Sequence, residues 1–172
     1  MTLPDARERI PFPLNTVKQG DAIRLLMKLP AASVDLIVTD PPYNVASPGK
    51  CTLRSGKPAS TDKVWGAWDM YHPFDYDVLM LELVREAYRV LQPGGAFYCF
   101  TAREYNGQFI RWAVERGFVY RNQLMILKRT PLPSLTKKNW RSAFEVCAYL
   151  TKGPPRVFHF LSRKHPRMTS LA

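Results

Sequence analysis

The chain has 172 residues, of which 46% are hydrophobic and 12% aromatic, enough for one domain with a buried core and too apolar for disorder over most of its length. No apolar run approaches the roughly 18 residues of a transmembrane helix, and residues 1–10 alternate charges where a signal peptide has an apolar core, which predicts a cytoplasmic protein. The three cysteines lie far apart and the three histidines lack metal-ligand spacing, so neither disulfides nor a metal site is expected.

The positive charge is concentrated in one part of the chain. The net charge is +11, yet residues 1–102 hold 11 basic and 11 acidic side chains, whereas residues 103–172 hold 14 basic and 3 acidic ones. A basic part beside a neutral part predicts a surface that contacts a polyanion, most simply nucleic acid. A solvated basic surface is the alternative.

The first predicted strand ends at an unusual tetrapeptide. Residues 34–39 form a β-branched run typical of a buried parallel strand, and Asp40-Pro41-Pro42-Tyr43 ends it because proline cannot donate to a sheet. Residues 44–64 have no periodicity and are rich in Gly, Pro, Ser and Lys. They predict a mobile loop of the length typical of lids and binding loops.

Helices alternate with strands in the rest of the chain. Apolar residues at three-to-four spacing predict a helix over 75–91, ended by Pro93-Gly94-Gly95, and another over 104–115, ended by Gly117. Strands are predicted over 96–100, 118–128 and 143–150. The alternation predicts an α/β sheet with crossover helices.

The tetrapeptide carries the chemistry. Ligands of an open α/β sheet bind at the carboxyl ends of its strands, where Asp40 to Tyr43 fall. The Asp40 carboxylate and the Pro41 carbonyl can each accept one N–H of an exocyclic amine, while the Tyr43 ring stacks on the heterocycle. Acceptors outside the ring plane favour a pyramidal nitrogen, which stabilises the transition state specifically. A Pro-Pro turn with a capping Asp and a packing Tyr is the structural alternative.

An ordered series of motifs resembles the amino-group DNA methyltransferases, in particular their circularly permuted β class of N6-adenine type. The series comprises Gly20-Asp21-Ala22, Thr39-Asp40-Pro41-Pro42-Tyr43, Trp65-Gly66-Ala67-Trp68-Asp69, residues 89–95, residues 128–133, Ser142-Ala143-Phe144-Glu145 and Lys164-His165-Pro166. The resemblance implies a Rossmann-like sheet, S-adenosyl-L-methionine (AdoMet) as cofactor, and site-specific methylation of a flipped-out adenine in double-stranded DNA, as in restriction–modification systems.

The resemblance also implies residue roles. Asp40, Pro41, Pro42 and Tyr43 are the expected catalytic residues. The expected cofactor-binding residues are Asp21, Ala22, Asp40, Lys164, His165 and Pro166. Segment 128–142 is expected to contact DNA phosphates through Lys128, Arg129, Lys137, Lys138 and Arg141. A solvated loop is the alternative for this segment.

One element of the family is missing. The permuted order places a Phe-x-Gly-x-Gly cofactor loop after Lys164-His165-Pro166, but no Gly-x-Gly occurs anywhere in the chain. Residues 1–172 are therefore expected to be a single, partial catalytic domain whose sheet lacks strands. A truncated fragment, an enzyme completed by a second chain or homodimer partner, and a non-catalytic DNA-binding or partner subunit all remain open. Methylation of RNA or protein is a further alternative.

Overall fold

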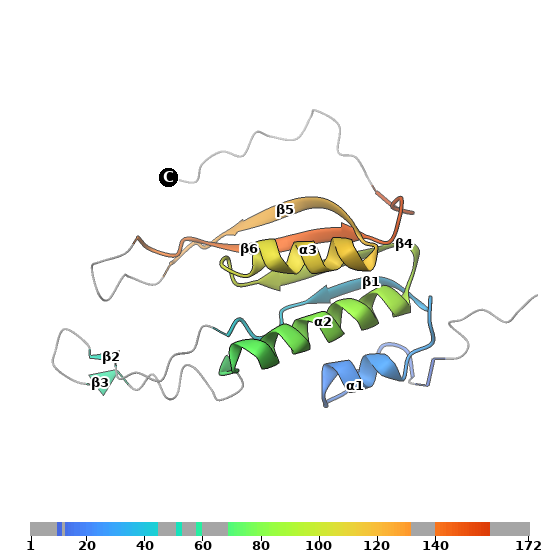
Figure 1. Cartoon of the computed structure of the whole chain (residues 1–172), viewed down its shortest axis with the longest axis horizontal. Coiled ribbons are helices and arrows are strands. Elements are labelled where there is room, and N and C mark those ends of the chain that lie inside the picture. The colour runs from blue at the N-terminus through green and yellow to red at the C-terminus, as the bar shows by residue number, and fades with distance from the viewer. Residues whose placement is uncertain are drawn as a thin grey trace, which may run out of the picture.

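The computed structural model describes residues 10–11, 13–44, 69–131 and 140–158, together with the backbone of two short strands within 51–59 (Figure 1). The elements are α1 (Ala22–Met27), β1 (Val34–Thr39), β2 (Cys51–Thr52), β3 (Pro58–Ala59), α2 (Pro73–Val90), β4 (Leu91–Thr101), α3 (Asn106–Arg116), β5 (Val119–Leu127) and β6 (Phe144–Thr151). Within these residues, no helix combines the length and apolar character needed to cross a membrane.

The main sheet has the order β1-β4-β6-β5 (Figure 1). β1 and β4 are parallel, and β6 runs antiparallel to both of its neighbours, β4 and β5. Because α2 connects β1 to β4 and α3 connects β4 to β5, each crossover joins strands of the same direction. The predicted α/β sheet with crossover helices is confirmed, with β6 inserted between β4 and β5.

The helices lie close to their predicted positions, but β4 is longer than predicted. α2 begins at Pro73, two residues before the predicted start, because proline is tolerated at a first helical position. β4 begins at Leu91, whereas the predicted strand began at residue 96. Gly94, at φ 79°, and Gly95 exchange backbone hydrogen bonds with Lys152 and so extend the strand.

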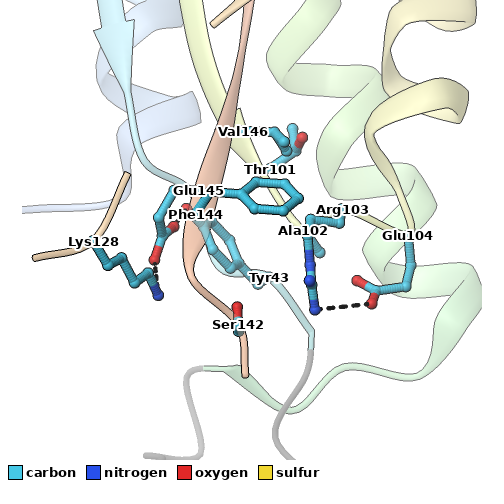
Figure 2. A pocket seen from close by; sticks show the side chains of 10 residues that line it. All are labelled: Tyr43, Thr101, Ala102, Arg103, Glu104, Lys128, Ser142, Phe144, Glu145 and Val146. Atoms are coloured by element: carbon cyan, nitrogen blue, oxygen red, sulfur yellow. Dashed lines mark hydrogen bonds and ion pairs between the residues drawn. The ribbon is translucent and has the colours of Figure 1, made fainter. Parts of the chain in front are cut away.

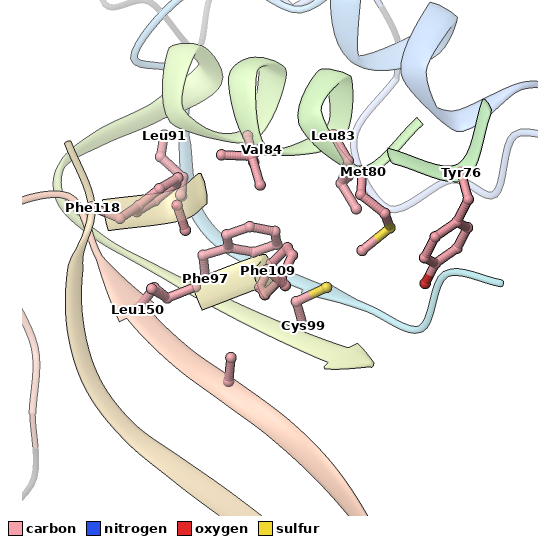
Figure 3. Close-up of a cluster of buried hydrophobic side chains, with 13 residues drawn as sticks. Tyr76, Met80, Leu83, Val84, Leu91, Phe97, Cys99, Phe109, Phe118 and Leu150 are labelled. Atoms are coloured by element: carbon pink, nitrogen blue, oxygen red, sulfur yellow. The ribbon is translucent and has the colours of Figure 1, made fainter. Parts of the chain in front are cut away.

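A cluster of buried side chains joins α2 and α3 to one face of the sheet (Figure 3). Phe97 of β4 packs at ring-centroid distances of 5.9 Å from Phe109 and 5.4 Å from Phe118. Met80 and Val84 of α2 close the cluster from the other side. This core fixes the direction in which the strands present their carboxyl ends.

The opposite face of the sheet is largely exposed, which corrects the prediction of a buried first strand. Leu36 and Val38 of β1 are 54% and 61% exposed, and their register with Ala96 and Tyr98 places them on this face. The rings of Tyr98 and Tyr149 stack there with centroids 4.6 Å apart. Within the described ranges, both α2 and α3 pack on the other side, so β1 is buried on one face only.

The segment predicted as a loop contains a short pairing. Cys51 pairs with Ala59 and Thr52 with Pro58 in an antiparallel ladder. The prediction of no regular structure over 44–64 is therefore wrong for β2 and β3, where β-branched Thr52 and neighbouring small residues permit pairing. The other residues beyond Asn44 in this segment lie outside the described part of the chain.

Candidate active site

Segments that are distant in the sequence meet at one end of the sheet. The carboxyl ends of β1, β4 and β5 and the beginning of β6 lie together there because β6 is antiparallel to its neighbours. They enclose a cavity of about 410 Å³, within the range of small-molecule sites. Figure 2 shows its lining: Tyr43, Thr101, Ala102, Arg103, Glu104, Lys128, Ser142, Phe144, Glu145 and Val146.

The tetrapeptide after β1 is held from below by two side chains. Asp69, only 1% exposed, accepts the backbone N–H groups of Tyr43 at 2.7 Å and Asn44 at 2.8 Å through Oδ1. The hydroxyl of Tyr76 donates to the Pro42 carbonyl at 2.9 Å. These bonds fix the backbone where it leaves the strand, so Pro42 serves the shape of the turn.

Tyr43 is connected to β6 and to the end of β5. Its hydroxyl donates to Oε2 of Glu145 at 2.9 Å, and Nζ of Lys128 lies 2.5 Å from Oε1 of the same carboxylate (Figure 2). Burial, followed by the neighbouring carboxylates of Asp40 and Glu145, raises the pKa of Tyr43 above its ordinary value. The phenol therefore keeps its proton at neutral pH.

Glu145 keeps its charge for the opposite reason. The hydrogen bond from Lys128 is the main cause that lowers the pKa of Glu145, against a smaller opposing effect of burial. The bond from Tyr43 and the charge of Arg103 lower this pKa further. Carboxylate, ammonium and phenol thus form one connected group on the cavity wall.

Phe144 supplies a second aromatic ring to the cavity, close to Tyr43 in Figure 2. The guanidinium of Arg103 lies 5.5 Å from the Phe144 ring centroid, and its Nη2 lies 3.9 Å from Glu104 Oε1. A cation stacked on an aromatic wall suits a planar, electron-rich guest beside a phosphate.

The predicted cofactor residues do not all meet. Asp40 is exposed at the carboxyl end of β1, beside Tyr43. Asp21 and Ala22 are exposed at the start of α1, where Asp21 caps the helix by accepting the N–H of Arg24 at 2.8 Å. Neither residue lines the cavity beside Tyr43. Lys164, His165 and Pro166 lie outside the described residues.

The predicted DNA-contacting cations are brought to the cavity rim where they are described. Lys128 lines the cavity and is bonded through its N–H to the Ala143 carbonyl at 2.8 Å, which brings the two ends of segment 128–142 together. Arg129 and Arg141 flank this bond and are exposed. Lys137 and Lys138 lie outside the described residues.

Several residues of the site had no predicted role. Asp69 and Glu145 end motifs that the sequence already displayed, Trp65 to Asp69 and Ser142 to Glu145, so their presence was visible but their bonds to Tyr43 were not. Tyr76 and Arg103 carried no signal at all, because a tyrosine on a helix and an arginine after a strand are ordinary.

Comparison with known proteins places the chain in a family. The sequence profile of the DNA methylase family N6_N4_Mtase matches residues 34–170, most of the chain. This chain belongs to the DNA methylase family. The Type II methyltransferase M.HinfI of Haemophilus influenzae is 28% identical over 156 residues, covering 90% of this chain and 43% of the relative. The DNA adenine methyltransferase YhdJ of Escherichia coli K12 is 33% identical over 110 residues, covering 64% and 32%.

Solved structures share the fold of this DNA methylase. The cytosine-N4-specific PvuII DNA methyltransferase gives a TM-score of 0.55 at 21% identity, covering 78% of this chain and 49% of that one. A DNA modification methylase of Thermus thermophilus, TTHA0409, complexed with S-adenosyl-L-methionine, gives 0.50 at 24% identity, covering 84% and 57%. The chain spans less than half the length of the curated relatives that it matches.

Proposed function

We propose that this DNA methylase transfers a methyl group from AdoMet to the N6 atom of an adenine flipped out of double-stranded DNA, as a β-class enzyme with permuted motif order. The observation that carries the proposal is the placement of Asp40 to Tyr43 at the carboxyl end of β1, beside a cavity with a second aromatic wall. Asp40 in the first motif position supports adenine over cytosine, as does the similarity to YhdJ.

In this proposal the target base enters the cavity between Tyr43 and Phe144. Unstacking the base from DNA is repaid by stacking on aromatic side chains. The Asp40 carboxylate and the Pro41 carbonyl accept the two N–H groups of the amine and localise its lone pair toward the methyl donor. Lys128, Arg129 and Arg141 at the rim hold phosphates, which positions the duplex without reading its sequence.

The described residues fit the cofactor in part. Asp40 presents an exposed carboxylate beside the cavity, whereas Asp21 caps α1 and does not line that cavity. When bound, AdoMet supplies an electrophilic methyl group. The part of the reaction assigned to this chain is to bind, orient and desolvate the amine that attacks it.

We infer that residues 1–172 are one part of a single catalytic domain, with 44–64 closing over the base. The coverage of the relatives and the absence of Gly-x-Gly support completion of the sheet by further sequence, a second chain or a homodimer partner. The same absence favours the second candidate function, a non-catalytic DNA-binding or partner subunit.

One experiment separates these functions. The chain is expressed in a host without adenine methylation, alone and with the coding sequence that continues or adjoins it, and N6-methyladenine is mapped in host DNA. We expect methylation at one short sequence, and Asp40→Ala to reduce the rate on that site at least about 100-fold, as when a transition-state contact is lost.

Glu115→Ala, which removes an exposed carboxylate on α3, is the control and should methylate normally. Salt-sensitive DNA binding without methyl transfer in either arrangement identifies the non-catalytic subunit. Labelled methyl groups on RNA or protein would redirect the substrate assignment, and an active Asp40→Ala variant would contradict the role of Asp40.

A further inference from the structure

The hydroxyl of Tyr43 has one proton and two carboxylates near it. The bond runs to Glu145, on β6, at 2.9 Å. Asp40 lies three positions before Tyr43 in the same turn, and its proximity contributes to the raised pKa of the phenol. A hydroxyl can donate to one acceptor at a time at full strength, so the two carboxylates compete for this proton.

Lys128 decides the competition. Its ammonium lies 2.5 Å from Glu145, and the two side chains are 36% and 30% exposed, so the pair is partly shielded from water. The ion pair orients the Glu145 carboxylate with Oε1 toward Lys128 and leaves Oε2 for the phenol. A charged, oriented acceptor makes the stronger hydrogen bond.

We propose that Glu145 is a positioning residue that takes the hydroxyl proton of Tyr43 and thereby leaves the Asp40 carboxylate as an acceptor for the target amine. The inference rests on the proposed function, which assigns the amine to Asp40. A phenol proton on Asp40 would occupy a lone pair that the amine needs and would lower the electron density on the oxygen. Glu145 therefore acts through Tyr43 and does not touch the base.

The test is a suppression experiment on the active polypeptide identified by the methylation map. In Glu145→Ala the hydroxyl turns to Asp40, and we expect kcat to fall about 10-fold, the effect of one charge-assisted hydrogen bond, with KM for DNA changed less than about 2-fold. In Tyr43→Phe the ring remains and no proton competes, so kcat should stay within about 3-fold of wild type. The double variant Tyr43→Phe/Glu145→Ala should recover the rate of Tyr43→Phe.

Two further variants separate positioning from folding. Glu145→Gln retains an oxygen that accepts the hydroxyl proton and should recover most of the rate, whereas Glu115→Ala should match wild type. If Glu145 were merely structural, the double variant would be at least as slow as Glu145→Ala, and Tyr43→Phe would not restore it. That result, or a fully active Glu145→Ala, overturns the inference.

A readout without activity distinguishes this inference from the proposed function. In a crystal structure of the Glu145→Ala variant, the Tyr43 hydroxyl should lie about 3 Å from an Asp40 carboxylate oxygen. A hydroxyl that stays directed away from Asp40 overturns the inference even if the enzyme methylates DNA. Absence of all methylation by the wild-type protein would instead overturn the proposed function, while the crystal structure still tests the competition for the proton.

Discussion

Asp69 illustrates how one buried carboxylate stabilises a turn made largely of proline. Pro41 and Pro42 have no N–H to donate, so the first donors after β1 are those of Tyr43 and Asn44. Both donate to the same Oδ1 atom of Asp69. Because charged acceptors form the stronger hydrogen bonds, this carboxylate contributes more to the turn than a neutral side chain would.

Replacing Asp69 tests this contribution. Asp69→Ala leaves two N–H groups without their acceptor and should lower the free energy of unfolding by about 3 kcal/mol, measured by urea denaturation. Asp69→Asn is the matched variant, since its amide oxygen can accept the same bonds without the charge, and it should cost about half as much. Equal losses in both variants would show that the charge, and not the accepted hydrogen bonds, stabilises the turn.

The predictability of the site follows from how local each signal is. Asp40 to Tyr43 could be predicted because a proline pair stops a strand wherever it occurs, and strand ends are where ligands bind. The partnership of Tyr43 with Glu145 could not, because it depends on the register of β6 across β4. That register joins segments far apart in the chain and leaves no periodic trace. Asp21, by contrast, serves its own helix, a role that its N-terminal position permits.

At the level of elements, α2 and α3 were predictable because each buries one stripe of apolar residues, and their ends carry proline or glycine. α3 ends at Gly117, which has φ 113°. An added Cβ there would lie 2.9 Å from the hydroxyl oxygen of Tyr88. β4 was harder to delimit because the bonds that extend it come from Lys152, after the strand made last.

Gly117→Ala should therefore destabilise the protein by about 1–2 kcal/mol, since it combines a left-handed backbone with a close contact. Gly107→Ala is a control within the same helix, where an added Cβ meets nothing within 4 Å. It should be neutral or stabilising by up to about 1 kcal/mol. Thermal unfolding of both variants measures the difference, and a stable Gly117→Ala variant would show that the turn relaxes without cost.

At the scale of the whole molecule, the two faces of the sheet differ. α2 and α3 cover one face, while Leu36, Val38, Leu124 and Ile126 are exposed on strands at the other or at its margins. Such apolar surface and the outer edge of β1 favour association with further protein. The arrangement supports the proposed completion of the sheet on the β1 side.

Val38→Lys tests this arrangement. Val38 is 61% exposed, so the substitution should change the free energy of unfolding little, but it should reduce self-association of residues 1–172, measured by light scattering over a range of protein concentrations. Val114→Lys introduces the same charge at a position on α3 that is 48% exposed and should leave association unchanged. If the wild-type chain is monomeric at all concentrations, the exposed face does not drive association of this chain.

The central place of β6 has a consequence for the order of folding during synthesis. β4 and β5 are made first, yet neither contacts the other in the sheet, because each pairs with β6. A nascent chain that has not reached residue 151 therefore carries two strands with exposed edges. The cavity also stays open on the side of Phe144 and Glu145 until that strand arrives. The final strand thus closes the sheet and completes the site in the same step, so a chain stalled before residue 144 has neither.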